Sequence, residues 1–141
     1  MANVTGGCLC GDVRFTSSQK PLSARICWCR TCRYFAAGNG TVNVVFPTDG
    51  FEVTGDMADF VSAADSGSRM HRRFCKTCGT QLFSEAESRP HLIIVRAGAL
   101  DDQSLVAPTA HIWTREAPDW ACLDPDLERI EGQPPAPPPP T

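Results

Sequence analysis

Apolar and polar residues alternate over short stretches throughout this chain of 141 residues. Such alternation predicts strands, because successive side chains of a strand point to opposite faces of a sheet. Val13 and Phe15, for example, fall on one face of a short strand. Residues 91–97 (HLIIVRA) form the most apolar stretch and predict a central strand. The other predicted strands are 4–9, 13–15, 23–28, 41–46, 51–54, 59–63, 69–74, 81–84 and 110–113.

Helical patterns are short. No stretch keeps apolar residues at the 3.6-residue spacing of a long amphipathic helix. Residues 124–130 predict one short helix, with Asp124 as its cap and Pro125 at its first position. Residues 29–37 suit a turn or one to two helical turns, residues 100–105 suit a short helical turn, and residues 66–68 suit a loop. We therefore expect a mostly-β domain.

The chain ends in a proline-rich stretch, QPPAPPPPT, at residues 133–141. A polyproline segment has few backbone donors for a sheet, so we expect an extended, solvated and disordered tail. The predicted domain then comprises residues 1–132.

Composition narrows the class of protein. Hydrophobic residues make up 42% and charged residues 21%, as in an ordinary globular protein. The net charge of -3 argues against a nucleic-acid binder with a broad basic surface. No apolar run approaches the roughly 18–20 residues of a membrane span, and the first residues lack the pattern of a secretory signal. We expect a cytoplasmic protein with no nucleic-acid or membrane partner.

Seven of the eight cysteines fall in three tight groups, and Cys122 stands alone. Thiols so close in sequence usually share a metal, because a disulfide between near neighbours is strained. A secreted disulfide scaffold is the alternative, but the absence of a secretory signal favours metal ligands. The groups are Cys8 and Cys10, then Cys27, Cys29 and Cys32, then Cys75 and Cys78.

The outer two groups predict one closed structural zinc site with four thiolates. Structural zinc is typically held by two cysteine pairs from separate turns, and Cys75 and Cys78 with Gly79 after them have this form. Cys8 and Cys10 supply the other half with a tighter spacing. Spacing alone leaves two alternatives open: one pair belongs to another metal arrangement, or Cys8 and Cys10 are free.

The central group predicts a second zinc with an open fourth position. Cys27, Cys29 and Cys32 supply three thiolates, and an open position distinguishes catalytic from structural zinc. Three thiolates make zinc a modest Lewis acid, which favours chemistry on a substrate thiol. The alternative is a structural site completed by Cys122, His111 or His71.

Arginines cluster near these cysteines in the sequence. Arg25, Arg30 and Arg33 flank the central group, and Arg69, Arg72 and Arg73 precede Cys75. Arginine binds carboxylates through two parallel hydrogen bonds, and its charge lowers the pKa of a nearby thiol. Some arginines will serve only to offset the anionic clusters. His111 shares one face of a short strand with Trp113. The candidate substrate-binding residues are Arg30, Arg33, Arg73 and His111.

Several motifs together resemble the glutathione-dependent formaldehyde-activating enzyme family, often named with centromere protein V. They are GGCLCGDVRF, CWCRTCR, GNG, VFP, FEVTG, RRFCKTCGTQLF, VRAGALDD, HIW and PDW. The resemblance implies a β-tent fold with short antiparallel sheets and zinc-binding turns. It also implies one zinc on Cys8, Cys10, Cys75 and Cys78 and a second on Cys27, Cys29 and Cys32. Trp28 stands where members of the family often have histidine, so we expect its ring to narrow or dry the pocket.

The family activity joins glutathione with formaldehyde to give S-hydroxymethylglutathione, a carbon–sulfur lyase reaction. The first hypothesis is therefore an enzyme whose thiol substrate reaches the open position of the zinc on Cys27, Cys29 and Cys32 and reacts with a small aldehyde. The second hypothesis is a module that binds or carries a thiol or a metabolite without turnover. The third is a purely structural two-zinc domain whose proline-rich tail recruits a partner. The oligomeric state is left open.

Overall fold

The computed structural model describes residues 3–64 and 67–139, in which strands far outnumber helices. Among these residues, no helix has the length and apolar character needed to cross a membrane. The mostly-β class predicted from the sequence is confirmed. In chain order the elements are β1 (Val4–Gly7), β2 (Arg14–Ser17), β3 (Ser23–Cys27), α1 (Arg30–Phe35), β4 (Thr41–Pro47), β5 (Phe51–Thr54), β6 (Met57–Ala63), β7 (Arg69–Cys75), β8 (Gln81–Ala86), β9 (Leu92–Arg96), η1 (Ala97–Ala99), β10 (Ala110–Ile112), η2 (Thr114–Glu116) and β11 (Glu128–Ile130).

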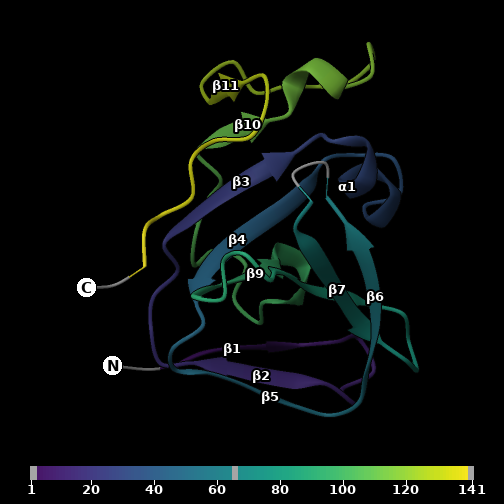
Figure 1. The fold of residues 1–141 in the computed structure, drawn as a ribbon, viewed down its shortest axis with the longest axis vertical. Coiled ribbons are helices and arrows are strands. Elements are labelled where there is room, and N and C mark those ends of the chain that lie inside the picture. Colours follow the sequence, from purple (N-terminus) through teal and green to yellow (C-terminus); the bar gives the residue numbers. More distant parts are fainter. Residues whose placement is uncertain (1–2, 65–66, 140–141) are drawn as a thin grey trace.

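The strands form two sheets. A three-stranded sheet has the order β1-β2-β5, and an eight-stranded sheet has the order β11-β10-β3-β4-β9-β8-β7-β6. In Figure 1 the small sheet lies at the bottom, and the large sheet rises above it. The pairs β3–β10 and β10–β11 are parallel, whereas the other strand pairs are antiparallel. The expected central strand is β9, which pairs with β4 and β8.

The main core is built around four phenylalanines. Phe15 stacks on Phe51 with ring centroids 5.3 Å apart, and both rings pack edge-on against Phe83. Phe46 completes the group with a centroid 5.8 Å from that of Phe51. These residues come from β2, β4, β5 and β8, so their burial joins the small sheet to the large one.

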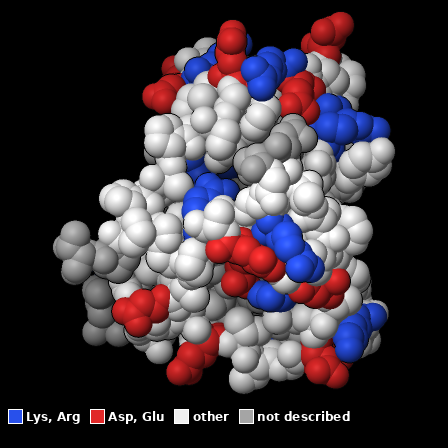
Figure 2. Space-filling model, viewed as in Figure 1, with Lys and Arg blue, Asp and Glu red and all other residues white. Residues whose placement is uncertain are grey.

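The outer face of β6, β7 and β8 carries alternating charges. His71 Nδ1 and Asp59 Oδ2 are 2.6 Å apart, and His71 Nε2 lies at the same distance from Glu87 Oε2. Arg73 pairs with Glu85 beside them. Acidic and basic side chains likewise lie together on the face shown in Figure 2. This face therefore presents mixed charge rather than a broad basic surface.

Two helical predictions differ from the structure. Residues 124–130 form a turn followed by β11, not a helix: Asp124 Oδ1 accepts the Asp126 N–H at 2.9 Å, and the backbone of Glu128–Ile130 pairs with β10. The helical turn expected at residues 100–105 is a single turn in which the Leu105 N–H donates to the Asp102 carbonyl at 3.3 Å, and the helix η1 lies before it at Ala97–Ala99. Of the predicted loop at residues 66–68, Ser66 lies outside the described residues.

Candidate metal centres and the adjoining cavity

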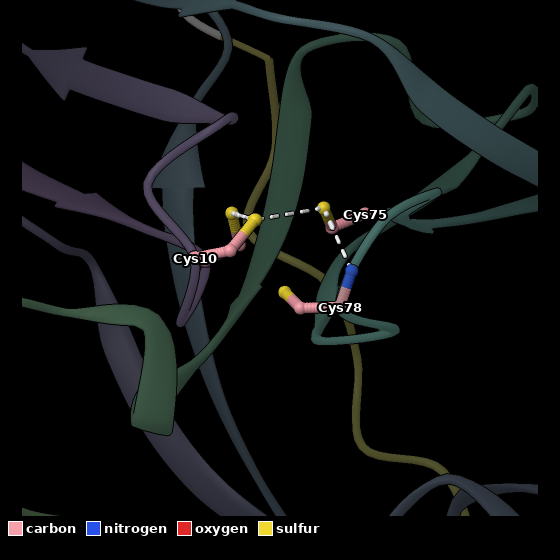
Figure 3. A group of neighbouring side chains, drawn as sticks. Cys10, Cys75 and Cys78 are labelled. Carbon is pink, nitrogen blue, oxygen red and sulfur yellow. Dashed lines mark hydrogen bonds between the residues drawn. The ribbon is translucent and has the colours of Figure 1, made fainter.

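Four cysteine sulfurs from two turns meet at one end of the small sheet (Figure 3). Cys8 and Cys10 lie in the turn between β1 and β2, Cys75 ends β7, and Cys78 follows in the turn to β8. Their sulfurs all lie within 4.8 Å of one another, with Cys8–Cys10 at 3.6 Å and Cys10–Cys75 at 3.7 Å. Four sulfurs bonded to one zinc ion stand about 3.8 Å apart, since each Zn–S bond is about 2.3 Å. The geometry therefore fits zinc, and the cysteines are free rather than paired as disulfides.

Backbone N–H groups and a hydroxyl support these sulfurs. The Val13 N–H donates to Cys8 Sγ at 3.3 Å, and the Thr77 N–H donates to Cys75 Sγ at 3.4 Å. Thr80 Oγ1 lies 3.1 Å from Cys78 Sγ, and hydrogen bonding by Thr80 lowers the pKa of Cys78 to about 5. Donors directed at sulfur stabilise the thiolate, which is the form that binds a metal. We call Cys8, Cys10, Cys75 and Cys78 the closed cluster.

Three further sulfurs meet where β3 of the large sheet ends and α1 begins. Cys27 ends β3, Cys29 caps the N-terminus of α1, and Cys32 lies within that helix. Cys29 Sγ accepts the Cys32 N–H at 3.3 Å, so the helix cap and the spacing of three residues place both sulfurs on one side. All three sulfurs lie within 4.8 Å of one another. We call Cys27, Cys29 and Cys32 the open trio.

No histidine, cysteine or carboxylate joins the open trio within the described part of the chain. Cys122 is exposed and outside the group. His71 is held between Asp59 and Glu87, which raise its pKa through hydrogen bonds, the one from Asp59 being the stronger. Two of the three alternative fourth ligands therefore do not complete the site: Cys122 lies outside the group, and His71 is engaged with Asp59 and Glu87.

His111, the third alternative, is buried behind the open trio. The Trp28 indole nitrogen lies 3.0 Å from His111 Nδ1, and the Asp124 backbone nitrogen lies 3.0 Å from Nε2; the neutral ring accepts a hydrogen bond from one of these two N–H groups. Burial lowers the pKa of His111. Neither His111 nor Trp28 lines the cavity described below. The expectation that the Trp28 ring narrows or dries the pocket is therefore wrong, because the indole packs on His111 and is only 2% exposed.

The open trio faces a cavity of about 130 Å³ between strands of the large sheet and the C-terminal segment. Four arginines line it, and none of them forms an ion pair within residues 3–64 and 67–139. Figure 2 shows basic side chains set back in a hollow of this face. The four arginines are Arg25 on β3, Arg72 on β7, Arg89 before β9 and Arg96 at the end of β9.

Arg96 connects this positive charge to the thiols. Its side chain is 6% exposed and donates from Nη1 to Asn43 Oδ1, while Asn43 Nδ2 lies 3.9 Å from Cys32 Sγ. The Nε atoms of Arg96 and Arg25 are buried without a hydrogen-bond partner among the described residues. Burial lowers the pKa of both arginines, which opposes their charged form. Buried N–H groups without partners are costly, so both guanidinium groups keep an unmet hydrogen-bond donor.

Negative charge in the open trio concentrates on one sulfur. The pKa of Cys32 falls to about 2, because the thiols of Cys27 and Cys29 hydrogen-bond to its thiolate and Arg96 adds positive charge nearby. The pKa of Cys27 is raised, since it acts as the donor in the same group. Three adjacent thiols thus favour one thiolate and resist the loss of further protons without a cation between them.

The predicted substrate residues lie outside the cavity lining. Arg30 stacks on the Tyr34 ring at 4.2 Å, and Arg33 Nε donates to the Trp28 carbonyl at 3.0 Å. Arg73 pairs with Glu85 on the outer face, and His111 is buried as described above. Of the other arginines noted near the cysteines, Arg25 and Arg72 do reach the cavity.

Arg89 and Arg96 are not among the residues predicted at the site. Arg96 had a signal in the sequence, because it is a lone charge in an otherwise apolar central strand, where a charge is rarely placed without a role. Arg89 had no such signal in the sequence, because it lies in a loop and only the folded structure brings it to the cavity.

Comparison with known proteins identifies the family. A sequence model of the glutathione-dependent formaldehyde-activating enzyme family matches residues 3–116. A search of curated proteins found no match. A crystal structure of a Rhodobacter sphaeroides protein has a similar fold, with a TM-score of 0.54 and 22% identity over 69% of this chain and 87% of that chain. The match of the family model spans all seven clustered cysteines and most of the chain, which therefore belongs to the glutathione-dependent formaldehyde-activating enzyme family.

Proposed function

We propose that this protein is an enzyme of the carbon–sulfur lyase type that forms or cleaves the S-hydroxymethyl adduct of a thiol, such as glutathione, and a small aldehyde, such as formaldehyde. The observation that carries the proposal is the open trio. It has three sulfurs and no fourth ligand among the described residues, and it faces a cavity lined by four arginines without carboxylate partners. A thiol that carries carboxylates matches both features. The free thiols of the chain fit the reducing cytoplasm.

The donor set of the open trio fits zinc, since three thiolates at these separations match its preferred ligands. When bound there, zinc supplies an electron-pair acceptor that favours the thiolate form of a substrate thiol. Arg96 and Arg25 line the cavity and supply positive charge that would bind the carboxylates of the substrate. Their positive charge also lowers the pKa of a thiol bound between them.

In the proposed reaction, a bond forms between the thiol sulfur and the carbonyl carbon of the aldehyde. The π electrons of the C=O bond move to oxygen, which takes up the proton lost by the thiol and becomes the hydroxyl of the adduct. The reverse reaction breaks the same carbon–sulfur bond. The chain contributes by holding the two reactants together and by binding the charged ends of the thiol, because thiolates already add readily to formaldehyde.

The test is the rate of adduct formation from glutathione and formaldehyde, followed by NMR with labelled formaldehyde. The proposal predicts acceleration above the uncatalysed rate that saturates with glutathione concentration. It also predicts that Cys29→Ala abolishes this acceleration, whereas Arg73→Met, a change on the outer face, preserves it. A rate that equals the uncatalysed rate at every protein concentration contradicts the enzymatic reading.

A second candidate is a carrier that binds a thiol without turnover. The observation in its favour is the lining of the cavity, which within the described chain includes no histidine, aspartate or glutamate to move a proton. Titration calorimetry with glutathione separates the two. Binding without acceleration of adduct formation indicates the carrier, and binding with acceleration indicates the enzyme.

A further inference from the structure

The proline-rich segment after β11 forms one side of the cavity of the open trio. Gln133, Ala136 and Pro137 are part of the cavity lining, together with the three cysteines and the arginines. The segment contains no helix or strand, and it begins 17 residues beyond the end of the family match at residue 116. In Figure 1 the chain passes from β11 back alongside the large sheet before it ends. The cavity is therefore bounded in part by a segment of this chain outside the region that matches the family.

Two anchors hold the segment in place. At one side, the Trp113 indole N–H donates to Gln133 Oε1 at 2.8 Å, and the Trp113 backbone N–H donates to the Gly132 carbonyl at 3.3 Å. At the other side, His91 Nε2 lies 2.9 Å from the Pro137 carbonyl oxygen, which can only accept, so Nε2 carries the proton. An extended polyproline chain rises about 3.1 Å per residue, so residues 133–137 span about 12 Å between the anchors.

Trp113, the residue of the first anchor, has an unusual backbone conformation. Trp113 has φ 55° and ψ 38°, in the left-handed region that is unfavourable for an aromatic residue. This conformation ends β10 and gives both N–H groups of Trp113 a partner at Gly132 or Gln133. Strain of this kind persists only where the surrounding contacts maintain it.

The size of the covered cavity limits what it can hold. Pockets that enclose drug-sized ligands usually measure about 300–1,000 Å³. The cavity here measures about 130 Å³ with the segment in place. A tripeptide is of drug-like size, so a cavity of this volume cannot enclose the whole of it, whereas it can enclose a small thiol or aldehyde.

We propose that residues 133–137 form a strap that closes the cavity of the open trio and sets the size of the thiol admitted. A tripeptide-sized thiol enters only when the strap leaves its anchors at Trp113 and His91. Proline suits this task, because it has no N–H to leave unpaired over the cavity and loses little entropy when the strap closes. The identity of the thiol rests on the proposed function, whereas the closing of the cavity does not.

The strap is tested on the zinc-loaded full-length protein by removing one side chain at each anchor. In the variant His91→Phe with Gln133→Ala, each anchor loses a hydrogen bond while the pocket cysteines and arginines remain. Gln103→Ala is the matched control, since Gln103 is an exposed glutamine outside the cavity lining. All proteins are alkylated with iodoacetamide, which is small, or with a fluorescein maleimide, which is large, and the labelled cysteines are mapped by mass spectrometry.

We expect the strap variant to raise the rate of maleimide labelling at the open trio about tenfold relative to iodoacetamide labelling. The relative labelling of Cys10, in the closed cluster, should stay unchanged and serves as an internal reference. The apparent Kd of glutathione should fall by the same factor, because the apparent affinity scales with the fraction of open protein. The Gln103→Ala control should behave like the unmodified protein.

Unchanged relative labelling of the open trio in the strap variant overturns the proposal. If labelling changes but glutathione binds neither protein, the strap stands and the proposed function fails. If the double variant does not fold, Gln133→Ala alone gives the answer, because it removes the Trp113 indole contact at an exposed position. Relative labelling that does not rise in that folded variant likewise overturns the proposal.

Discussion

Replacing Arg96 by methionine tests whether this arginine serves a ligand or the fold. Arg96 is buried at the end of a central strand, its Nε has no partner among the described residues, and Asn43 accepts from Nη1. Methionine preserves much of the side-chain volume and removes the charge. A hydrogen bond between charged groups contributes about 1.5–3 kcal/mol, and 1.4 kcal/mol corresponds to a factor of ten. We therefore expect the KM for glutathione to rise about 10- to 100-fold.

Stability should respond differently. The substitution leaves Asn43 Oδ1 without its donor, but it also removes a buried charge that has no carboxylate partner in the described chain. These two effects oppose each other, and replacing buried charge by apolar volume is often neutral or stabilising. We expect the Tm of Arg96→Met to change little.

The assay compares two thiols. Steady-state adduct formation is measured with glutathione, which carries carboxylates, and with 2-mercaptoethanol, which carries none. The KM should rise for glutathione alone. Arg73→Met is the control, because Arg73 pairs with Glu85 on the outer face and lies outside the cavity lining. A lower Tm with an unchanged KM, or an equal rise in KM for both thiols, refutes the assignment of Arg96 to carboxylate binding.

Three further predictions concern the two clusters and the charged face. Cys75→Ala should unfold the domain, which circular dichroism would detect as loss of the β-sheet signal. A structural zinc site contributes about 10 kcal/mol, whereas the total free energy of unfolding of a domain is about 5–15 kcal/mol. A folded variant with full metal content contradicts a structural role for the closed cluster. Cys29→Ala should remain folded with one metal fewer per chain by mass spectrometry, and an unfolded variant shows instead that the open trio is structural. Asp59 and Glu87 raise the pKa of His71 in the folded protein above its unfolded value of about 6.5. The pairing of protonated His71 with these carboxylates therefore stabilises the fold fully below about pH 6.5, and this stabilisation is lost as the pH rises through the raised pKa. The urea midpoint should therefore fall over this range, and the fall should be smaller in His71→Gln; equal slopes in both proteins refute the assignment.

Features set by local pattern could be read from the sequence. The alternation in FEVT predicts a strand at residues 51–54, and β5 has these bounds. The spacing of the cysteines predicts three tight groups, and the fold brings them into the two clusters expected. In both cases neighbouring residues determine the outcome, since a strand face and a pair of ligands in one turn depend on little beyond the local chain.

Features set by contacts between distant segments could not be read from the sequence. Asp124 and Pro125 are typical of a helix start, but the backbone of residues 128–130 pairs with β10 instead, because tertiary pairing overrides a weak local preference. Arg89 and Arg96 meet the open trio only after β9 is placed beside β4. The Trp28 ring turns towards His111, 83 residues away in the sequence, rather than into the pocket.

The contacts of the proline-rich segment likewise join residues that are far apart in the sequence. Composition alone predicts a solvated end for residues 133–141. The interactions of Gln133 with Trp113 and of Pro137 with His91 depend on positions that no local pattern reveals. Sequence patterns thus located the clustered sulfurs, while the fold determined which charges and which segment surround them.

The central claim is that seven thiols bind two zinc ions as a group of four and a group of three, which leaves one position for a substrate thiol. Zinc X-ray absorption on the zinc-loaded protein measures the mean number of sulfur ligands per zinc. The account predicts about 3.5 sulfurs per zinc in the free protein, rising to about 4 when glutathione is added. A value of 4 before any thiol is added, or a value that glutathione does not change, contradicts it.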